Sequence, residues 1–184
     1  MGTRPKLADH PLAPASVVAE SGSLYVLGLD PGLAVTGYGI LKSSTGGTLL
    51  VEAGVIRISR GKSLEDRLDE LYEGVAELLQ CWPVEEVAVE QLYSHYSRPR
   101  TAILMGHARG VLYLAAARKK LPVHAYLPTK VKKYMTGNGH ASKPQMQAAV
   151  QSQLRLSTPL EPHDVADALA IALCHLSHRN YAGQ

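Results

Sequence analysis

The spacing of apolar and polar residues divides this chain into candidate strands and helices. Three strand-like runs come first, over Leu24–Leu29, Val35–Leu41 and Thr48–Ile58, and short turn sequences rich in Gly, Pro and Ser separate them. Connections of this kind favour consecutive antiparallel hairpins. The first part of the folded region is therefore predicted to be a three-stranded meander.

From Ser63 onward the apolar residues follow a helical period. A helix here is followed by a β-branched strand over 85–91, an Ala-rich helix over 101–120, a short strand over 121–126 and a Gly-rich break at 137–139. A last helix is predicted to begin near Pro162, because proline is favoured in the first turn. Strands that alternate with helices require parallel pairing and helices on the sheet faces. The predicted fold is α/β, with a mixed five-stranded sheet flanked by helices.

Length and composition fit one globular domain. The chain has 184 residues, of which 46% are hydrophobic, enough for a single core. Residues 1–23 are rich in Ala, Pro and Ser and predict a disordered N-terminal arm, so the domain is expected over 24–180. No apolar run approaches the ~20 residues of a membrane span. The two cysteines lack metal-ligand spacing, and we expect a soluble cytoplasmic protein.

Charge is distributed very unevenly along the chain, although the formal net charge is only +3. Residues 91–160 contain no Asp or Glu and are interleaved with tyrosines. Such a long basic segment indicates a polyanion partner, with nucleic acid the usual one. Its basic residues are Arg98, Arg100, Arg109, Arg118, Lys119, Lys120, Lys130, Lys132, Lys133, Lys143 and Arg155.

Carboxylates stand at the ends of predicted buried elements. Asp30 ends the first strand in LYVLGLDPG, Glu90 ends the strand EEVAVEQ, and Asp164 and Asp167 share one face at the start of the last helix. Adjacent parallel strands end side by side, so the four acids are expected to converge and to hold hard ions such as Mg²⁺ or Mn²⁺. Two alternatives remain: Asp30 as a simple turn-former, and the helix acids as capping residues.

Three motifs, GLDPGLAVTGYGIL, VAVEQLY and HDVADALAIALCH, give the chain a specific resemblance. In this order and at these separations they resemble the RuvC family of bacterial Holliday-junction resolvases, over roughly Leu24 to His178. The resemblance implies an RNase H-like fold, a homodimer, and Mg²⁺-dependent symmetric nicking of four-way DNA junctions in recombination and repair. It also makes the RuvA and RuvB branch-migration proteins candidate partners. By motif, Asp30, Glu90, Asp164 and Asp167 are the expected catalytic metal ligands, with two ions per active site.

The resemblance extends to residues expected to contact DNA. Tyr93 occupies the place of an aromatic residue that wedges into bases at the junction centre, and a packed loop tyrosine is an equal alternative. Lys132 and Lys143 match lysines that face the scissile phosphate. General phosphate contacts are expected from Lys130, Lys133, Arg98, Arg100 and Arg109.

Histidine and glycine residues leave further questions open. His163 immediately precedes Asp164, the first acid of the last motif, and is interpreted as a metal ligand, a proton donor to the leaving oxygen, or a residue without a role in catalysis. His124, His175 and His178 lie on predicted elements without a partner at ligand spacing and are expected to be structural. The glycines of the first two strands indicate either close backbone approach or turns and bulges: Gly28, Gly32, Gly37 and Gly39.

Two other functions fit the same residues. A related nuclease that cuts RNA or an RNA–DNA hybrid would share the acids and differ mainly in its binding surface. A non-catalytic junction-binding protein would use the acids only as caps. The second alternative is disfavoured, because DNA binding gains nothing from concentrated negative charge.

Overall fold

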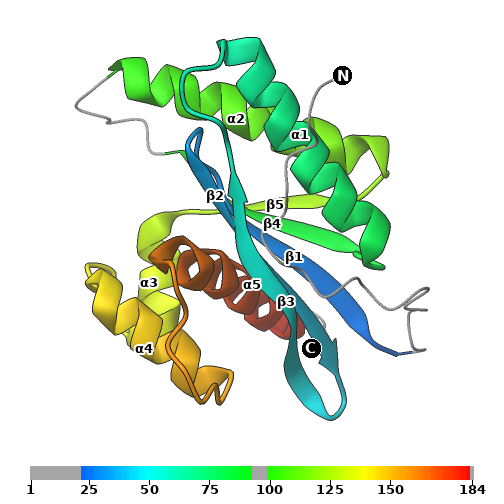
Figure 1. The fold of residues 1–184 in the computed structure, drawn as a ribbon. Helices are drawn as coiled ribbons and strands as arrows, with labels where there is room; N and C mark the ends of the chain where they lie inside the picture. The colour runs from blue at the N-terminus through cyan, green and yellow to red at the C-terminus, as the bar shows by residue number, and fades with distance from the viewer. Residues whose placement is uncertain (1–21, 93–98, 183–184) are drawn as a thin grey trace.

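A computed structural model of the chain describes residues 22–92 and 99–182. Tyr93, Arg98 and residues 1–21 of the expected N-terminal arm lie outside the described residues. One five-stranded sheet, in the order β3-β2-β1-β4-β5, forms the centre of the fold (Figure 1). Its strands are β1 (Leu24–Asp30), β2 (Val35–Ser44), β3 (Gly47–Arg57), β4 (Glu86–Glu90) and β5 (Val123–Tyr126).

Strand directions confirm the predicted meander and mixed sheet. β1 pairs with β2, and β2 with β3, in antiparallel fashion, whereas β4 is parallel to both β1 and β5. β5 begins at Val123, two residues later than predicted. The residues before it form a turn in which Lys120 adopts a left-handed conformation, with φ of 57°, so the strand cannot start there.

Helices cover both faces of the sheet, as predicted. α1 and α2 pack on one face and α5 lies on the other, with α3 and α4 beside it (Figure 1). Within the described residues, no helix combines the length and the apolar character needed to cross a membrane. The helices are α1 (Leu64–Cys81), α2 (Pro99–Arg118), α3 (Pro128–Thr136), α4 (Lys143–Gln153) and α5 (His163–Ala182).

Local sequence explains several of these boundaries. The Ser63 side chain accepts a hydrogen bond from the Asp66 backbone N–H and caps α1. Ser142 and Gln145 form a reciprocal capping box at the start of α4. α3 ends at Gly137, whose φ of 77° is a left-handed conformation that glycine adopts at no steric cost. The predicted Gly-rich break therefore separates α3 from α4.

The alternation of side chains along β1 assigns its residues to two cores. Leu27 and Leu29 belong to the core beneath α1 and α2, whereas Val26 belongs to the core beneath α5. Because successive strand residues point to opposite faces, Gly28 and Asp30 share the α5 face with Val26. The end of β1 therefore presents its carboxylate to the face on which α5 lies.

Helix α5 approaches the sheet too closely for side chains at two glycine positions. A Cβ built at Gly28 would overlap the carbonyl oxygen of Ala168 and come within 2.9 Å of the Ala172 Cβ, and one at Gly37 would overlap the carbonyl oxygen of Asp164. These glycines thus provide close backbone approach to a helix. They form neither turns nor bulges.

We predict that Gly28→Ala lowers the free energy of unfolding by about 3 kcal/mol, because the added methyl group meets helix backbone that cannot move without repacking. Urea denaturation of both proteins measures the difference. Gly46→Ala is the control: its Cβ would meet only the Ser44 Oγ, at 3.7 Å, and should change stability by less than about 0.5 kcal/mol. Equal stability of the two variants would contradict the close approach.

Candidate active site

Asp30 and Glu90 lie next to each other at one edge of the sheet. β1 and β4 are parallel neighbours, and Leu29 pairs with Val89, so the following residues end the two strands side by side. Both strands present these positions to the α5 face, because Ala88 of β4 belongs to the core beneath α5 and Glu90 follows it by two residues. The sheet thus places two carboxylates at the same point.

The first turns of α5 bring the other two acids to this point. Gly37 pairs with Asp30 across the β1–β2 ladder. The backbone of Asp164 lies directly over Gly37, where a Cβ would overlap it. Asp167 follows by three residues and shares a helix face with Asp164. We refer to Asp30, Glu90, Asp164 and Asp167 as the acid site.

The charges of the acid site act strongly on one another. Burial, followed by the charges of Glu90, Asp167 and Asp164, raises the pKa of Asp30 well above its usual value. Burial and the charge of Asp167 raise the pKa of Glu90 from 4.5 to about 7. Burial is also the largest cause of the raised pKa of Asp167. Shifts of this size in a group of facing carboxyls are typical of a functional site.

Two lysines partly offset this repulsion. Lys143, at the start of α4, lowers the pKa values of Asp30, Glu90 and Asp167, and Lys132 of α3 lowers those of Glu90 and Asp167. The structure therefore brings to the acid site the two lysines that the motifs had singled out. Their charge is insufficient to return the carboxyls to their ordinary pKa values.

His163 begins α5 and lies beside Asp167. Its charge acts to lower the pKa of that carboxyl. Its Nδ1 atom is buried and has no hydrogen-bond partner among the residues that the structure describes. A buried ring nitrogen without a partner is costly unless a ligand or substrate uses it.

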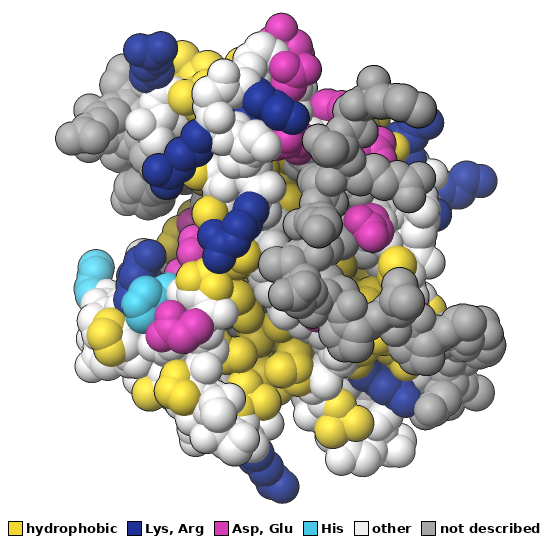
Figure 2. All heavy atoms as spheres, in the orientation of Figure 1, with side chains coloured by type: hydrophobic (Ala, Val, Ile, Leu, Met, Phe, Trp, Pro, Cys, Tyr) yellow, Lys and Arg dark blue, Asp and Glu magenta, His cyan; other side chains and the backbone are white. Residues whose placement is uncertain are grey.

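The other predicted DNA contacts differ in position. Arg100, Lys130 and Lys133 are exposed. Lys130 lies over the Tyr126 ring, with its Nζ atom 5.5 Å from the ring centre. Arg109 donates a hydrogen bond of 2.6 Å to the Tyr113 hydroxyl. On the left of the face drawn in Figure 2, Asp and Glu side chains are set back between groups of Lys and Arg.

The donor set of the acid site fits a hard divalent cation. Carboxylate oxygens are the ligands that Mg²⁺ and Mn²⁺ prefer. Burial and the repulsion between like charges raise the pKa values of Asp30, Glu90 and Asp167 and so disfavour their ionised forms. A bound cation would remove both penalties, so the residues present fit such a group.

Sequence reasoning missed a second group of facing side chains. Glu86, His124 and His175 each offer a ligand atom, and these atoms all lie within 4.8 Å of one another. Packing therefore gives His124 and His175 a facing carboxylate, although neither has a partner at ligand spacing in the sequence. The signal was weak, because the two histidines are 51 positions apart in the chain and only the packing of α5 on β4 and β5 brings them together. The period-2 alternation from Glu86 to Glu90 could have placed Glu86 on that face.

The chain has an α/β fold in which carboxylates converge at the strand ends of a mixed sheet, beneath the final helix. This arrangement is that of the RNase H-like fold class. Residues 26–175 match the family model described as "Crossover junction endodeoxyribonuclease RuvC". The chain belongs to the RuvC family.

Relatives support this assignment across nearly the whole folded region. A crossover junction endodeoxyribonuclease RuvC from Rhodopirellula baltica is 54% identical over 159 residues, which cover 86% of this chain and 89% of the relative. One from Pelotomaculum thermopropionicum is 43% identical over 155 residues, covering 84% and 94%. The structure titled "T. thermophilus RuvC in complex with Holliday junction substrate" matches with a TM-score of 0.80 and 32% identity, covering 86% and 96%.

The raised pKa of Glu90 predicts a pH dependence of stability in metal-free protein. With its pKa moved from 4.5 to about 7, folded Glu90 retains a proton that the unfolded chain has lost. The contribution of Glu90 to stability is therefore present below about pH 4.5 and is lost as pH rises through 7, by no more than about 3 kcal/mol.

Urea denaturation in EDTA between pH 5 and pH 8 measures this loss. Glu90→Gln removes the titrating group, so the difference in the free energy of unfolding between variant and wild type should grow in favour of the variant as pH rises. A difference that stays constant with pH would contradict the raised pKa.

Proposed function

We propose that this protein is a crossover junction endodeoxyribonuclease that resolves four-way (Holliday) DNA junctions by metal-dependent symmetric nicking in recombination and repair. The observation that carries the proposal is the convergence of Asp30, Glu90, Asp164 and Asp167 at one sheet edge in a chain of the RuvC family. A related structure described as RuvC with a Holliday junction substrate supports the choice of DNA substrate.

The acid site is proposed to hold two Mg²⁺ ions, with Mn²⁺ as a substitute. Such ions, when bound, generate a nucleophile from water at neutral pH and stabilise the attacking and leaving oxygens of a phosphodiester. The carboxylates of Asp30, Glu90, Asp164 and Asp167 supply the ligand oxygens. Asp30 and Glu90 are fixed by strand backbone, so their oxygens need little reorganisation before the reaction.

Basic side chains at the site are proposed to bind and orient the strand that is cut. Lys132 and Lys143 influence the carboxyl pKa values and so lie within electrostatic reach of the acid site. There they would stabilise the negative charge that develops on the phosphate. Arg98, Arg100, Arg109, Lys130 and Lys133 are proposed as contacts to the phosphate backbone, with Tyr93 as a base-stacking residue.

His163 is proposed to act at the same point. Its unpaired buried Nδ1 and its position beside Asp167 support a role as a metal ligand or as the donor of a proton to the leaving oxygen. Either role would provide the ring nitrogen with the partner that it lacks among the described residues.

Two active sites in a homodimer would cut two strands of one junction. Support for a dimer comes from α2, where the Ile103 and Leu114 side chains are 62% and 52% exposed. Eleven residues apart, they lie on the same face of the helix, three turns from each other. Large apolar side chains aligned on a surface helix are typical of a protein interface. We further propose RuvA and RuvB as partners and the cytoplasm as the location.

Cleavage of a synthetic four-way junction tests the function. In Mg²⁺ the protein is expected to make paired symmetric nicks in the junction and to leave matched linear duplex and RNA–DNA hybrid intact. Asp30→Asn and Asp167→Asn should each reduce the nicking rate at least about a hundredfold, because each removes an anionic ligand from the site. EDTA should abolish the reaction.

Asp69→Asn, an exposed change on α1, is the matched control and should nick like wild type. Junction binding should persist in both acid-site variants, since each removes negative charge. Cleavage of the hybrid in place of the junction would instead establish an RNA-acting nuclease. Full nicking by Asp30→Asn would refute the proposed metal site.

The dimer proposal has its own test. Ile103→Lys combined with Leu114→Lys should convert the protein to a monomer, because burying two ammonium groups in an apolar contact is costly. Light scattering during size exclusion measures the mass. Leu49→Lys, at an equally exposed apolar residue of β3, should leave the dimer intact. An unchanged mass in the double variant would exclude this face of α2.

A further inference from the structure

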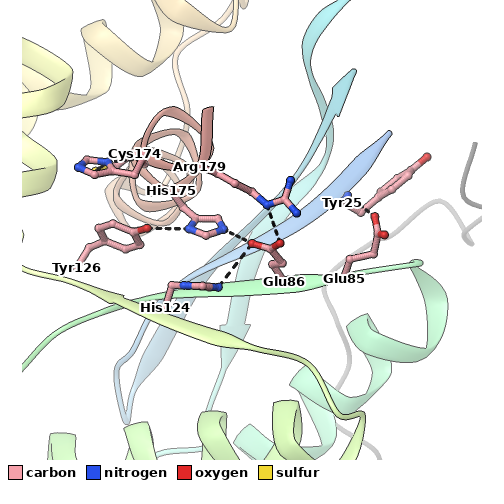
Figure 3. A network of polar contacts seen from close by, with 9 residues as sticks. Tyr25, Glu85, Glu86, His124, Tyr126, Cys174, His175 and Arg179 are labelled. Atoms are coloured by element: carbon pink, nitrogen blue, oxygen red, sulfur yellow. Dashed lines mark hydrogen bonds and ion pairs between the residues drawn. The ribbon is translucent and has the colours of Figure 1, made fainter. Parts of the chain in front are cut away.

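A second group of facing polar side chains lies between the sheet and α5, toward the start of β4 and away from the acid site. Glu86 begins β4 and lies four residues, or about 13 Å, from Glu90 along the strand. His124 projects from β5, where it pairs with Ala88, and His175 projects from α5 (Figure 3). We call Glu86, His124 and His175 the histidine site.

The nitrogens of both imidazoles point toward one carboxylate oxygen. The Glu86 Oε2 atom lies 2.6 Å from the His175 Nε2 atom and 3.6 Å from the His124 Nε2 atom. The first contact is a hydrogen bond, and the second is too long to be one. In a tetrahedral zinc site with ligand distances of about 2.0–2.1 Å, neighbouring ligand atoms are about 3.4 Å apart. The two observed distances from Glu86 Oε2, 2.6 Å and 3.6 Å, lie on either side of this ligand-to-ligand spacing.

The outer contacts of His175 are those of a metal-ligating histidine. The Tyr126 hydroxyl lies 2.7 Å from the His175 Nδ1 atom. A hydroxyl can donate or accept, so its oxygen can accept a hydrogen bond from the His175 Nδ1–H when Nε2 binds a cation. A partner of this kind fixes ring orientation and tautomer at metal sites.

Arg179 is the feature that opposes a cation. Its Nε atom lies 2.8 Å from Glu86 Oε1, the oxygen that faces away from the two imidazoles. The Arg179 side chain is 54% exposed, so solvent screens its charge and the side chain can swing away. The Oε2 atom faces the two imidazoles, and an ion bound there would replace the hydrogen bond between Oε2 and the His175 Nε2 atom.

A hydrogen-bond network without an ion would explain only part of this arrangement. Arg179 and His175 already satisfy the Glu86 carboxylate. His124 makes no hydrogen bond in that network, because its Nε2 atom is 3.6 Å from Glu86 Oε2 and pairs with it only when the ring is protonated. Its ring nevertheless lies against His175, tilted by 32° with centres 4.4 Å apart, and its Nε2 atom faces the same oxygen. A cation shared by all three side chains accounts for that position.

We propose that Glu86, His124 and His175 bind a transition-metal ion of the zinc class, which joins β4, β5 and α5. Imidazole nitrogens with one carboxylate oxygen suit Zn²⁺ and do not suit Mg²⁺. The His124 side chain is 42% exposed, so the ion reaches the site from solvent and water completes its coordination. The site is distinct from the acid site and is expected to stabilise the fold.

Metal binding in excess Mg²⁺ tests this proposal independently of nuclease activity. Mg²⁺ occupies the carboxylates and leaves imidazole free. Untagged full-length protein should bind one Zn²⁺ per chain by calorimetry, with a rise in melting temperature. Co²⁺ should give the visible absorption of a tetrahedral nitrogen–oxygen site. Arg179→Gln should tighten binding, because it removes the opposing charge.

Two histidine variants test whether Zn²⁺ binds at the histidine site or elsewhere on the protein. His124→Ala, a change at a part-exposed residue, should weaken Zn²⁺ binding at least about tenfold and remove the rise in melting temperature. His140→Ala removes an exposed histidine from the loop between α3 and α4 and should bind like wild type. Wild-type protein that binds no Zn²⁺ in excess Mg²⁺, or His124→Ala that binds as tightly as wild type, would overturn the proposal.

Discussion

The close contact between α5 and the sheet is the constraint on which the rest of the structure depends. At Gly28 and Gly37 the strands have no side chain, and the helix backbone occupies the space that a Cβ would need. Small residues of α5 complete the contact, since Ala168 and Ala172 are fully buried against β1. A helix seated this closely cannot shift without steric overlap. Its residues therefore have fixed positions over the sheet.

That fixed position creates the acid site at an electrostatic cost. The start of α5 lies over the ends of β1 and β2, so Asp164 and Asp167 face Asp30 in a partly buried space. Burial and like charge raise the pKa values of Asp30, Glu90 and Asp167, and Lys132 and Lys143 offset this only partly. The same groups suit divalent cations, which supply the missing positive charge. The clustered carboxylates thus lower the stability of this part of the fold and at the same time form a set of ligands suited to a metal ion.

Strand β4 shows how neighbours decide the behaviour of a carboxylate. Glu86 and Glu90 lie on the same face of one strand, and burial acts to raise the pKa of both. At Glu86 the hydrogen bond from His175 and the charge of Arg179 outweigh burial and lower the pKa. At Glu90 burial and the charge of Asp167 outweigh the opposing charges of Lys132 and Lys143, and the pKa rises to about 7. One end of the strand holds a stabilised anion, and the other holds a carboxyl group whose ionisation is disfavoured by its surroundings.

The sequence by itself determined the elements and the acids of this protein. Apolar and β-branched runs bounded by turn residues predicted all five strands, and the helical period predicted helices that cover them, because these signals are local to each element. Strand-end positions and motif order singled out Asp30 and Glu90 in the same way. The histidine site was not predictable, since Glu86, His124 and His175 come from three elements far apart in the chain. The reason for Gly28 and Gly37 was also undecided, because a missing side chain has meaning only when its neighbour is known. Only the packing of α5 on the sheet decided the histidine site and the role of these two glycines, because packing brings together residues that no local pattern relates.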